Sequence, residues 1–162
     1  MRVPKRRRLE GKTNYRLRIN ILRSEKPRIV FRKSNKYITG QFIKSENAQD
    51  YVITGTTSKE LLFYGWPKEK IGSLKSLPAC YLTGFLLGKK VLEKSKEDCV
   101  FDIGVLRNIK KSRIYAFLKG AKDAGVRINA KEKVFPDERR LRGDSIGLKE
   151  IFEKVKLNIE NE

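Results

Sequence analysis

Carboxylates are the side chains in this sequence with the clearest catalytic potential. The chain of 162 residues contains no histidine, which removes imidazole bases and ligands and the usual serine and cysteine triads. Asp50, Asp102 and Asp123 carry groups that can hold Mg²⁺ for phosphodiester cleavage. They show no diagnostic spacing, and an aspartate in an apolar segment, such as Asp102, more often accepts buried hydrogen bonds. A metal-dependent nuclease that uses Asp102 is therefore the weaker hypothesis.

Other site chemistries have little support in the sequence. Cys80 and Cys99 are too few for a disulfide framework or a four-ligand zinc site, and we expect both to be small buried residues. Gly84 and Gly88 fall in a predicted helix and form no phosphate-binding loop. We therefore predict that the chain is not an enzyme and uses no cofactor, metal or small-molecule substrate.

Positive charge is the dominant feature of the composition. The chain has 38 Lys and Arg against 19 Asp and Glu, a net charge of +19. This excess indicates a polyanionic partner, which is a nucleic acid, an anionic membrane or an acidic protein. Residues 1–36 hold 14 of the basic residues and only Glu10 and Glu25 as acids. The basic surface is therefore expected at the N-terminal end of the chain.

The first twelve residues contain Pro4, Gly11 and a basic run at 5–8. This composition cannot bury enough apolar surface to fold unaided, so we predict an extended arm that its partner orders. A solvated tail or a localisation-like basic patch is the alternative interpretation of the run.

No membrane segment is expected. Met1 is followed by charge and not by the apolar core of a signal peptide. The longest apolar run is broken by Lys89 and Lys90, well short of the ~20 residues that span a bilayer. We predict a cytoplasmic protein without a membrane partner.

Hydrophobic periodicity and turn residues predict an α+β (mixed α/β) fold, with helices packed on a mixed sheet. Thr13 is the expected cap of the first helix, and Gly125 is the expected end of another. The apolar segment 99–105 is predicted to be a central strand, and Gly84 and Gly88 to pack closely on the sheet. The expected helices span residues 13–23, 78–94, 112–124 and 148–155. A further short helix is expected to start at the capping box 57–60. The expected strands span residues 28–33, 37–44, 51–55 and 99–105.

The predicted organisation is an arm (1–12), a globular domain (13–147) and a C-terminal helix or tail (148–162). In the first helix, Tyr15, Ile19 and Leu22 share one narrow apolar side.

The two faces of the predicted hairpin differ in character. Alternation places Ile29, Phe31, Ile38 and Phe42 on a core face. The other face is basic and hydrogen-bonding, and Tyr37 on it is a candidate for stacking on a base. Its residues are Arg28, Val30, Arg32, Tyr37, Thr39 and Gln41. Continuity with the basic run at 5–8 favours RNA over a solvated face.

A second basic cluster precedes the predicted helix 112–124. It contains Arg107, Lys110, Lys111 and Arg113. A helix N-terminus favours phosphate, so this junction is a further candidate RNA contact. An ordinary solvated loop is the equally good alternative.

Several segments resemble the archaeal form of universal large-subunit ribosomal protein eighteen, whose eukaryotic relative is large-subunit protein five. The segments occur in the family's order and cover about residues 5–147. They are RRRLEGKTNY (6–15), PRIVFRKSNK (27–36), YGW (64–66), PACYLTG (78–84), FDIG (101–104), LKGAKDAG (118–125) and VFPDE (134–138). The sequence departs from the family pattern at Gly40, where Ala is usual, in an arm that starts late and in a short C-terminal tail.

The resemblance implies a structural protein that binds 5S rRNA and attaches it to the large-subunit rRNA at the central protuberance of the ribosome. Neighbouring large-subunit ribosomal proteins are the other implied partners. A generic basic RNA-binding protein is the alternative that charge alone supports. The residues implied to bind RNA are Arg2, Lys5, Arg6, Arg7, Arg8, Lys12, Thr13, Tyr15, Arg16, Arg18, Arg28, Arg32, Lys33, Ser34, Asn35, Lys36, Tyr37, Gln41, Lys110, Lys111, Ser112 and Arg113.

Overall fold

A four-stranded mixed sheet forms the middle layer of the molecule, which the computed structural model describes over residues 3–47 and 49–161. Strands β1 and β2, and β2 and β3, pair antiparallel, whereas β4 runs parallel to β1. The mixed α+β fold predicted from the sequence is therefore confirmed. The strands are β1 (Arg28–Lys33), β2 (Ile38–Glu46), β3 (Gln49–Thr57) and β4 (Val100–Asp102), in the spatial order β3-β2-β1-β4.

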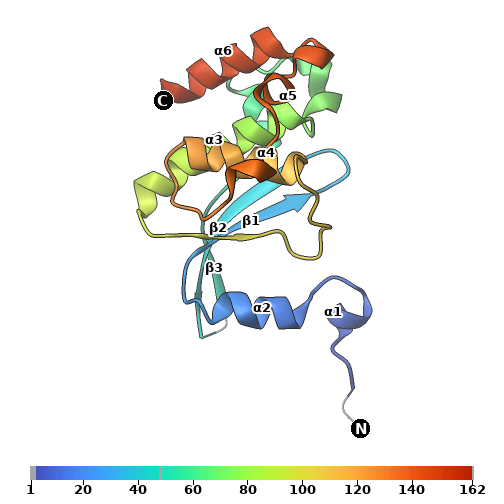
Figure 1. Ribbon diagram of the computed structural model, residues 1–162, viewed down its shortest axis with the longest axis vertical. Helices are drawn as coiled ribbons and strands as arrows, with labels where there is room; N and C mark the ends of the chain where they lie inside the picture. The colour runs from blue at the N-terminus through green and yellow to red at the C-terminus, as the bar shows by residue number, and fades with distance from the viewer. Residues whose placement is uncertain (1–2, 48, 162) are drawn as a thin grey trace.

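Helices lie on both sides of this sheet (Figure 1). Helices α3 and α4 cover one face, α5 and α6 lie beyond them, and α2 lies on the opposite side near the end of the β2–β3 hairpin. The α-helices are α1 (Arg6–Leu9), α2 (Tyr15–Leu22), α3 (Leu77–Lys94), α4 (Arg113–Asp123), α5 (Glu138–Arg142) and α6 (Lys149–Glu160). Short 3₁₀ turns are η1 (Ser58–Leu62), η2 (Lys68–Ser73), η3 (Glu132–Val134) and η4 (Asp144–Ile146).

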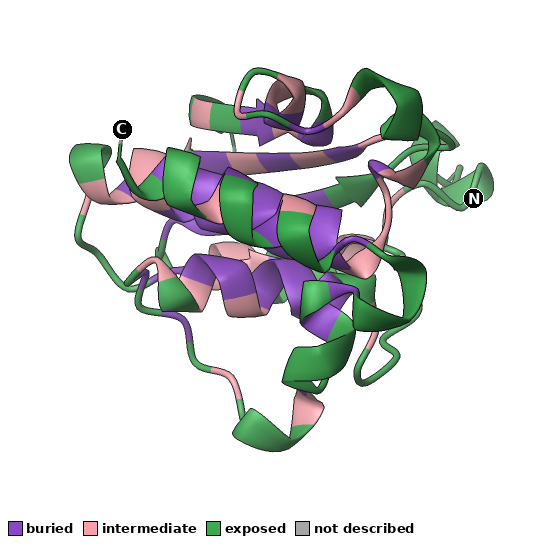
Figure 2. Ribbon diagram, turned by 90° about the horizontal axis from the view of Figure 1, so that it is seen from above, coloured by how far each residue is buried: buried purple, intermediate pink, exposed green. Residues whose placement is uncertain are grey.

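The hydrophobic core lies between the sheet and α3, and it includes the C-terminal helix. The predicted core face of the hairpin is confirmed, because Ile29, Phe31, Ile38 and Phe42 are all buried. The buried side of α6 contributes Phe152, Val155 and Ile159 to the same cluster, while its other side is exposed (Figure 2). Both cysteines are buried, as predicted.

Glycines bring α3 and α4 into backbone contact. A Cβ atom on Gly84 would overlap the carbonyl oxygen of Phe117, and one on Gly120 would overlap that of Tyr81. The prediction that Gly84 and Gly88 pack on the sheet was wrong: their neighbours belong to α4, because small residues let two helices approach closely. Across the described ranges, no helix is long and apolar enough to span a membrane.

Strand β4 lies at an edge and not in the centre of the sheet. Only residues Val100–Asp102 pair with β1, although residues 99–105 were predicted to be a strand. The Asp102 carboxylate accepts a hydrogen bond from the Gly104 N–H (2.7 Å), and Gly104 has a φ of +63°. This turn ends the strand, because it directs the chain away from β1.

The described N-terminal residues include two short helices. Helix α1 is a single turn with an i,i+4 ion pair between Arg6 and Glu10 (3.0 Å), so part of the predicted arm is helical. Helix α2 begins at Tyr15, and its cap is Asn14, whose side chain accepts from the Leu17 N–H (3.1 Å).

The hydroxyl of Thr13, the predicted cap, instead accepts a hydrogen bond from Arg7 (2.9 Å). Ile19 was also misplaced, because it is half exposed. The partly buried residues of α2 are Tyr15, Arg18, Ile21 and Leu22.

We predict that Gly84→Ala destabilises the fold. Alanine favours a helix by about 1 kcal/mol over glycine, but its methyl group would force α3 away from Phe117. Overpacking typically costs about 1–3 kcal/mol, and the upper end applies because the overlap is with backbone atoms of Phe117, so the net loss in the free energy of unfolding is expected to reach about 2 kcal/mol. Urea unfolding monitored by fluorescence of the buried Trp66 measures this change. Gly72→Ala is the control, because a Cβ there meets no atom within 4 Å; equal stability of both variants would contradict the prediction.

Candidate nucleic-acid interface

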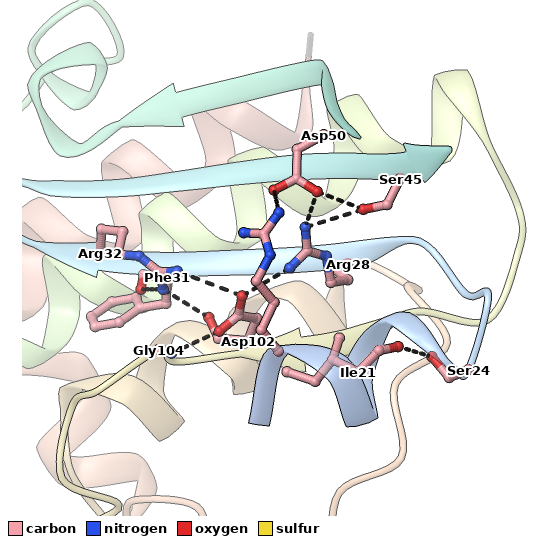
Figure 3. A network of polar contacts seen from close by, with 10 residues as sticks. Ile21, Ser24, Arg28, Phe31, Arg32, Ser45, Asp50, Asp102 and Gly104 are labelled. Atoms are coloured by element: carbon pink, nitrogen blue, oxygen red, sulfur yellow. Dashed lines mark hydrogen bonds and ion pairs between the residues drawn. The ribbon is translucent and has the colours of Figure 1, made fainter. Parts of the chain in front are cut away.

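A buried charge network lies beneath the basic face of the sheet (Figure 3). Arg28 of β1 is only 3% exposed. Its guanidinium donates to Asp50 (2.6 Å), to Asp102 (3.3 Å) and to the Ser45 hydroxyl (3.1 Å). Alternation predicted the correct face of the sheet for Arg28. It also predicted that the side chain is exposed and faces RNA, and this part was wrong. The side chain is interior, because α2 and the end of the β2–β3 hairpin cover this part of the sheet.

Two further arginines connect the network to the surface. Arg18 of α2 pairs with Asp50 (3.0 Å), which ties the helix to the end of β3. Arg32 pairs with the Asp102 carboxylate (3.5 Å) and donates to the Asp102 backbone oxygen (3.2 Å), and its side chain is about half exposed. The network therefore fixes both α2 and the exposed Arg32 relative to the sheet.

Opposing influences set the pKa of Asp50. Burial on its own raises this pKa, but hydrogen bonds from Ser45 and Arg28 and the charges of Arg28 and Arg18 outweigh it. The pKa of Asp50 is therefore lower than its ordinary value of 3.8.

The three aspartates considered as magnesium ligands have other partners. Asp50 and Asp102 face the Arg28 guanidinium. Asp123 accepts from the Tyr81 hydroxyl (2.9 Å) and pairs with Lys119 (3.0 Å) on the helical side of the molecule. Within residues 3–47 and 49–161, no cluster of three potential metal ligands is found.

A cationic cavity of about 390 Å³, which we call the arm pocket, lies between the N-terminal helices and the sheet edge. Its lining combines predicted arm residues with predicted hairpin residues. The basic ones are Arg7, Lys12, Arg18, Arg28, Arg32 and Lys33, and Thr13 also lines the pocket. Asp102 is the acidic residue in this lining, and Arg28 and Arg32 pair with it. The arm and β1 therefore form one basic surface.

The other predicted RNA-binding residues of the arm and of the start of α2 are at the surface. Lys5 lies over the ring of the partly buried Tyr15 (4.8 Å to the centroid). Arg6, Arg8 and Arg16 are exposed, and Arg8, Tyr15 and Arg16 border a neighbouring cavity of about 400 Å³. Arg2 lies outside the described residues.

The hairpin turn is exposed, but not all of the predicted stacking face is. Ser34, Asn35 and Lys36 are exposed, and the Ser34 hydroxyl accepts from the Tyr37 N–H (2.9 Å) to close the turn. Tyr37 is half-buried and packs against the hydrophobic core, and Gln41 is half-buried in β2. The exposed polar groups therefore gather at the turn.

The junction before α4 borders a second and larger cavity of about 830 Å³, which we call the apolar pocket. Lys111, Ser112 and Arg113 line it, whereas Lys110 is exposed in the loop but does not. Lys33 and Leu106 line both the apolar pocket and the arm pocket. The structure therefore brings the arm, the end of β1 and the junction into one continuous surface.

Arg140 of α5 also lines the apolar pocket, and sequence reasoning did not include it among the candidates. No local pattern distinguishes Arg140 from its charged neighbours Arg139 and Arg142. Arg140 reaches the apolar pocket only because of the path that the chain takes between α4 and α6.

Comparison with known proteins gives consistent matches. The family model described as "Ribosomal large subunit proteins 60S L5, and 50S L18" matches residues 1–101. "Large ribosomal subunit protein uL18" of Methanothrix thermoacetophila is 46% identical over 90% of this chain and 83% of its own length. The uL18 proteins of Korarchaeum cryptofilum and Methanococcus maripaludis are 45% and 43% identical over 90% of this chain, and over 72% and 73% of their own lengths.

We predict that Arg28→Met lowers the free energy of unfolding by up to about 3 kcal/mol, because loss of a partner leaves buried carboxylate charge only partly compensated, by Arg18 and Arg32. Asp102 has a side chain only 9% exposed and would lose its most buried cation. Urea unfolding followed by Trp66 fluorescence measures the change. Arg8→Met at an exposed position is the matched control and should have little effect. A loss of the same size in both variants would contradict the interpretation of Arg28.

We also predict that Asp50→Asn removes part of the acid sensitivity of the fold. The pKa of Asp50 is lower in the folded than in the unfolded chain, so its contribution to stability is full above about pH 4 and is lost as the pH falls below that value. The stability difference between wild type and Asp50→Asn should therefore shrink between pH 5 and pH 2, measured by urea unfolding. Asp144→Asn, at an exposed site, should run parallel to wild type. Parallel curves for Asp50→Asn as well would refute the prediction.

Proposed function

This chain belongs to the uL18 family of large ribosomal subunit proteins, and on that premise we propose that it binds 5S rRNA and attaches it to the large-subunit rRNA in the central protuberance. The coarser statement follows directly from the family: the chain is a structural constituent of the large ribosomal subunit and not an enzyme. The choice of 5S rRNA and of the central protuberance follows the family resemblance in the sequence motifs.

The observation that carries this proposal is the continuous basic surface from the arm to the start of α4. Arm residues and β1 residues share the arm pocket, and Lys33 leads from it to the junction at Lys111 and Arg113. RNA backbone carries one negative charge per nucleotide, so a cationic track along several elements matches it better than a single charged patch does.

The parts of this surface have different proposed roles. The exposed arginines of the N-terminal segment, such as Arg8 of the arm and Arg16 of α2, contact phosphates and supply affinity. The exposed hairpin turn with Ser34, Asn35 and Lys36 recognises the shape of the RNA and contacts its unpaired bases. Arg28 supports both parts from the interior and is not itself a contact.

The opposite side of the molecule is the proposed contact surface for neighbouring ribosomal proteins. Two large apolar residues are exposed there. Phe63, at the C-terminal end of η1, is 87% exposed, and Leu157 of α6 is 58% exposed. Exposed apolar side chains that form a contiguous patch are typical of protein–protein contact sites.

The second candidate function is binding of RNA without selectivity, which the net charge of +19 favours by itself. The two functions differ in selectivity. A 5S-specific protein prefers 5S rRNA over tRNA at near-physiological salt, whereas a generic binder has equal affinity for both.

We predict that 5S rRNA binding weakens steeply with salt. If about six phosphates are contacted, log K against log[salt] should have a slope of roughly −4 to −5. Arg8→Ala with Arg16→Ala should make the slope less steep by roughly 1.5, because each lost phosphate contact removes up to ~0.9. Filter binding or fluorescence anisotropy between 50 and 300 mM salt provides the measurement.

Lys149→Ala with Lys154→Ala is the matched control for this experiment. Both lysines are exposed on α6, away from the basic surface, and the double variant removes the same charge. Its slope should equal that of wild type. A slope near zero for wild type, or an equal change in both double variants, would reject the proposed interface.

A further inference from the structure

The apolar pocket combines an open cavity with apolar walls. It lies between the start of α3, the loop before α4 and the turn from α5 to η4, and its volume of about 830 Å³ is within the range of roughly 300–1,000 Å³ for ligand sites. Ile109 and Ile146 at its mouth are 52% and 55% exposed. The apolar walls include Leu77, Pro78, Leu106, Ile109, Ile114 and Ile146. Apolar surface that faces solvent in a cavity is available to a ligand.

Cations surround these apolar walls. Lys33, Arg107, Arg113 and Arg140 come from four separate segments, and none of them forms an ion pair or a side-chain hydrogen bond within the described residues. Lys111 is the fifth cation and pairs with the exposed Asp137 (3.0 Å). Four cations without an acidic partner around one cavity indicate an anionic ligand, because like charges otherwise repel one another there.

The start of α4 is part of the pocket lining. Ser112 is the N-cap residue of this 11-residue helix, but its side chain makes no capping hydrogen bond. Its hydroxyl oxygen is buried and has no hydrogen-bond partner among the described residues. A buried polar group without a partner is costly, and a phosphate at a helix N-terminus accepts from hydroxyl and backbone N–H groups together.

We propose that the apolar pocket receives one unpaired nucleotide of the bound RNA, with its base against the apolar walls and its phosphate beside Ser112 and Arg113. This inference rests on the proposed function and specifies which part of the RNA is recognised. A base is flat and largely apolar on its faces while its phosphate is anionic, so one nucleotide satisfies both parts of the lining.

A single nucleotide explains the position of the pocket better than an acidic peptide does. Lys33 and Leu106 form a wall shared with the arm pocket, so the cations around the cavity continue into the basic surface that the arm provides. A peptide with one or two carboxylates would occupy only part of this track. An RNA strand can place one base in the pocket while neighbouring phosphates follow the cations outside it.

The first experiment removes apolar surface from the pocket without a change in charge. Ile109→Ser with Ile146→Ser should weaken 5S rRNA binding by about tenfold, because an inserted base loses its apolar contacts. The salt dependence should stay as steep as in wild type, since no cation is altered. Phe63→Ser with Leu157→Ser is the matched control, because it removes two exposed apolar side chains elsewhere, and it should bind like wild type.

The outcomes separate the inference from the proposed function. Unchanged affinity of the Ile109/Ile146 variant, with wild type still selective for 5S rRNA, overturns the nucleotide site and leaves the proposed function in place. Equal weakening in both double variants also overturns it, because the effect would then be general. Loss of 5S selectivity in wild type itself rejects the proposed function.

A second experiment identifies the occupant directly. A photoreactive diazirine side chain at Ser145, an exposed residue of the pocket lining, is activated in intact large ribosomal subunits. The proposal predicts crosslinks to one unpaired nucleotide of 5S rRNA. Crosslinks to a ribosomal protein, to base-paired RNA or to no partner at all would show that no nucleotide enters this pocket.

Discussion

The buried guanidinium of Arg28 is the constraint on which the arrangement of the basic surface depends. A cation in the interior costs several kcal/mol unless carboxylates and hydrogen-bond acceptors surround it. Asp50 from β3, Asp102 from β4 and Ser45 from β2 meet this need. Each of these groups can do so only if its strand has the observed register. The Arg28 guanidinium therefore determines how three strands align. Through the ion pair of Asp50 with Arg18, it also determines where α2 lies.

The two sides of the sheet are held by different kinds of interaction. On the helical side, glycines place the backbones of α3 and α4 in contact, and apolar side chains fill the remaining space. On the basic side, hydrogen bonds and ion pairs hold α2, which has no fully buried residue. The candidate RNA contacts on β1 and at the start of α4 therefore lie on a closely packed layer, whereas those of the arm are held mainly by polar contacts that RNA phosphates can also make.

Local patterns predicted most of the fold, and contacts between distant segments account for the errors. Alternation in residues 28–44 was sufficient for the hairpin and its core face, and Gly125 marked the end of α4. The edge position of β4 and the interior position of Arg28 were not predictable from local pattern, because each depends on a partner about 70 residues away in sequence. The same holds for Arg140, which reaches the apolar pocket only through the fold. The assignment of individual residues to RNA contacts remains a prediction.

The long sequence separation within the charge network has a consequence for synthesis on the ribosome. Residues emerge from N- to C-terminus, and domains generally complete folding only when their distant partners are present. Arg28 lacks Asp102 until 74 more residues have been made, and the apolar pocket lacks Arg140 and Ile146 for longer still. A nascent chain therefore displays most of its cationic residues before it has the shape to position them. During this interval the cationic residues lack the folded framework that positions them, and the proposed RNA surface is complete only when β4 and the helices after it have been made.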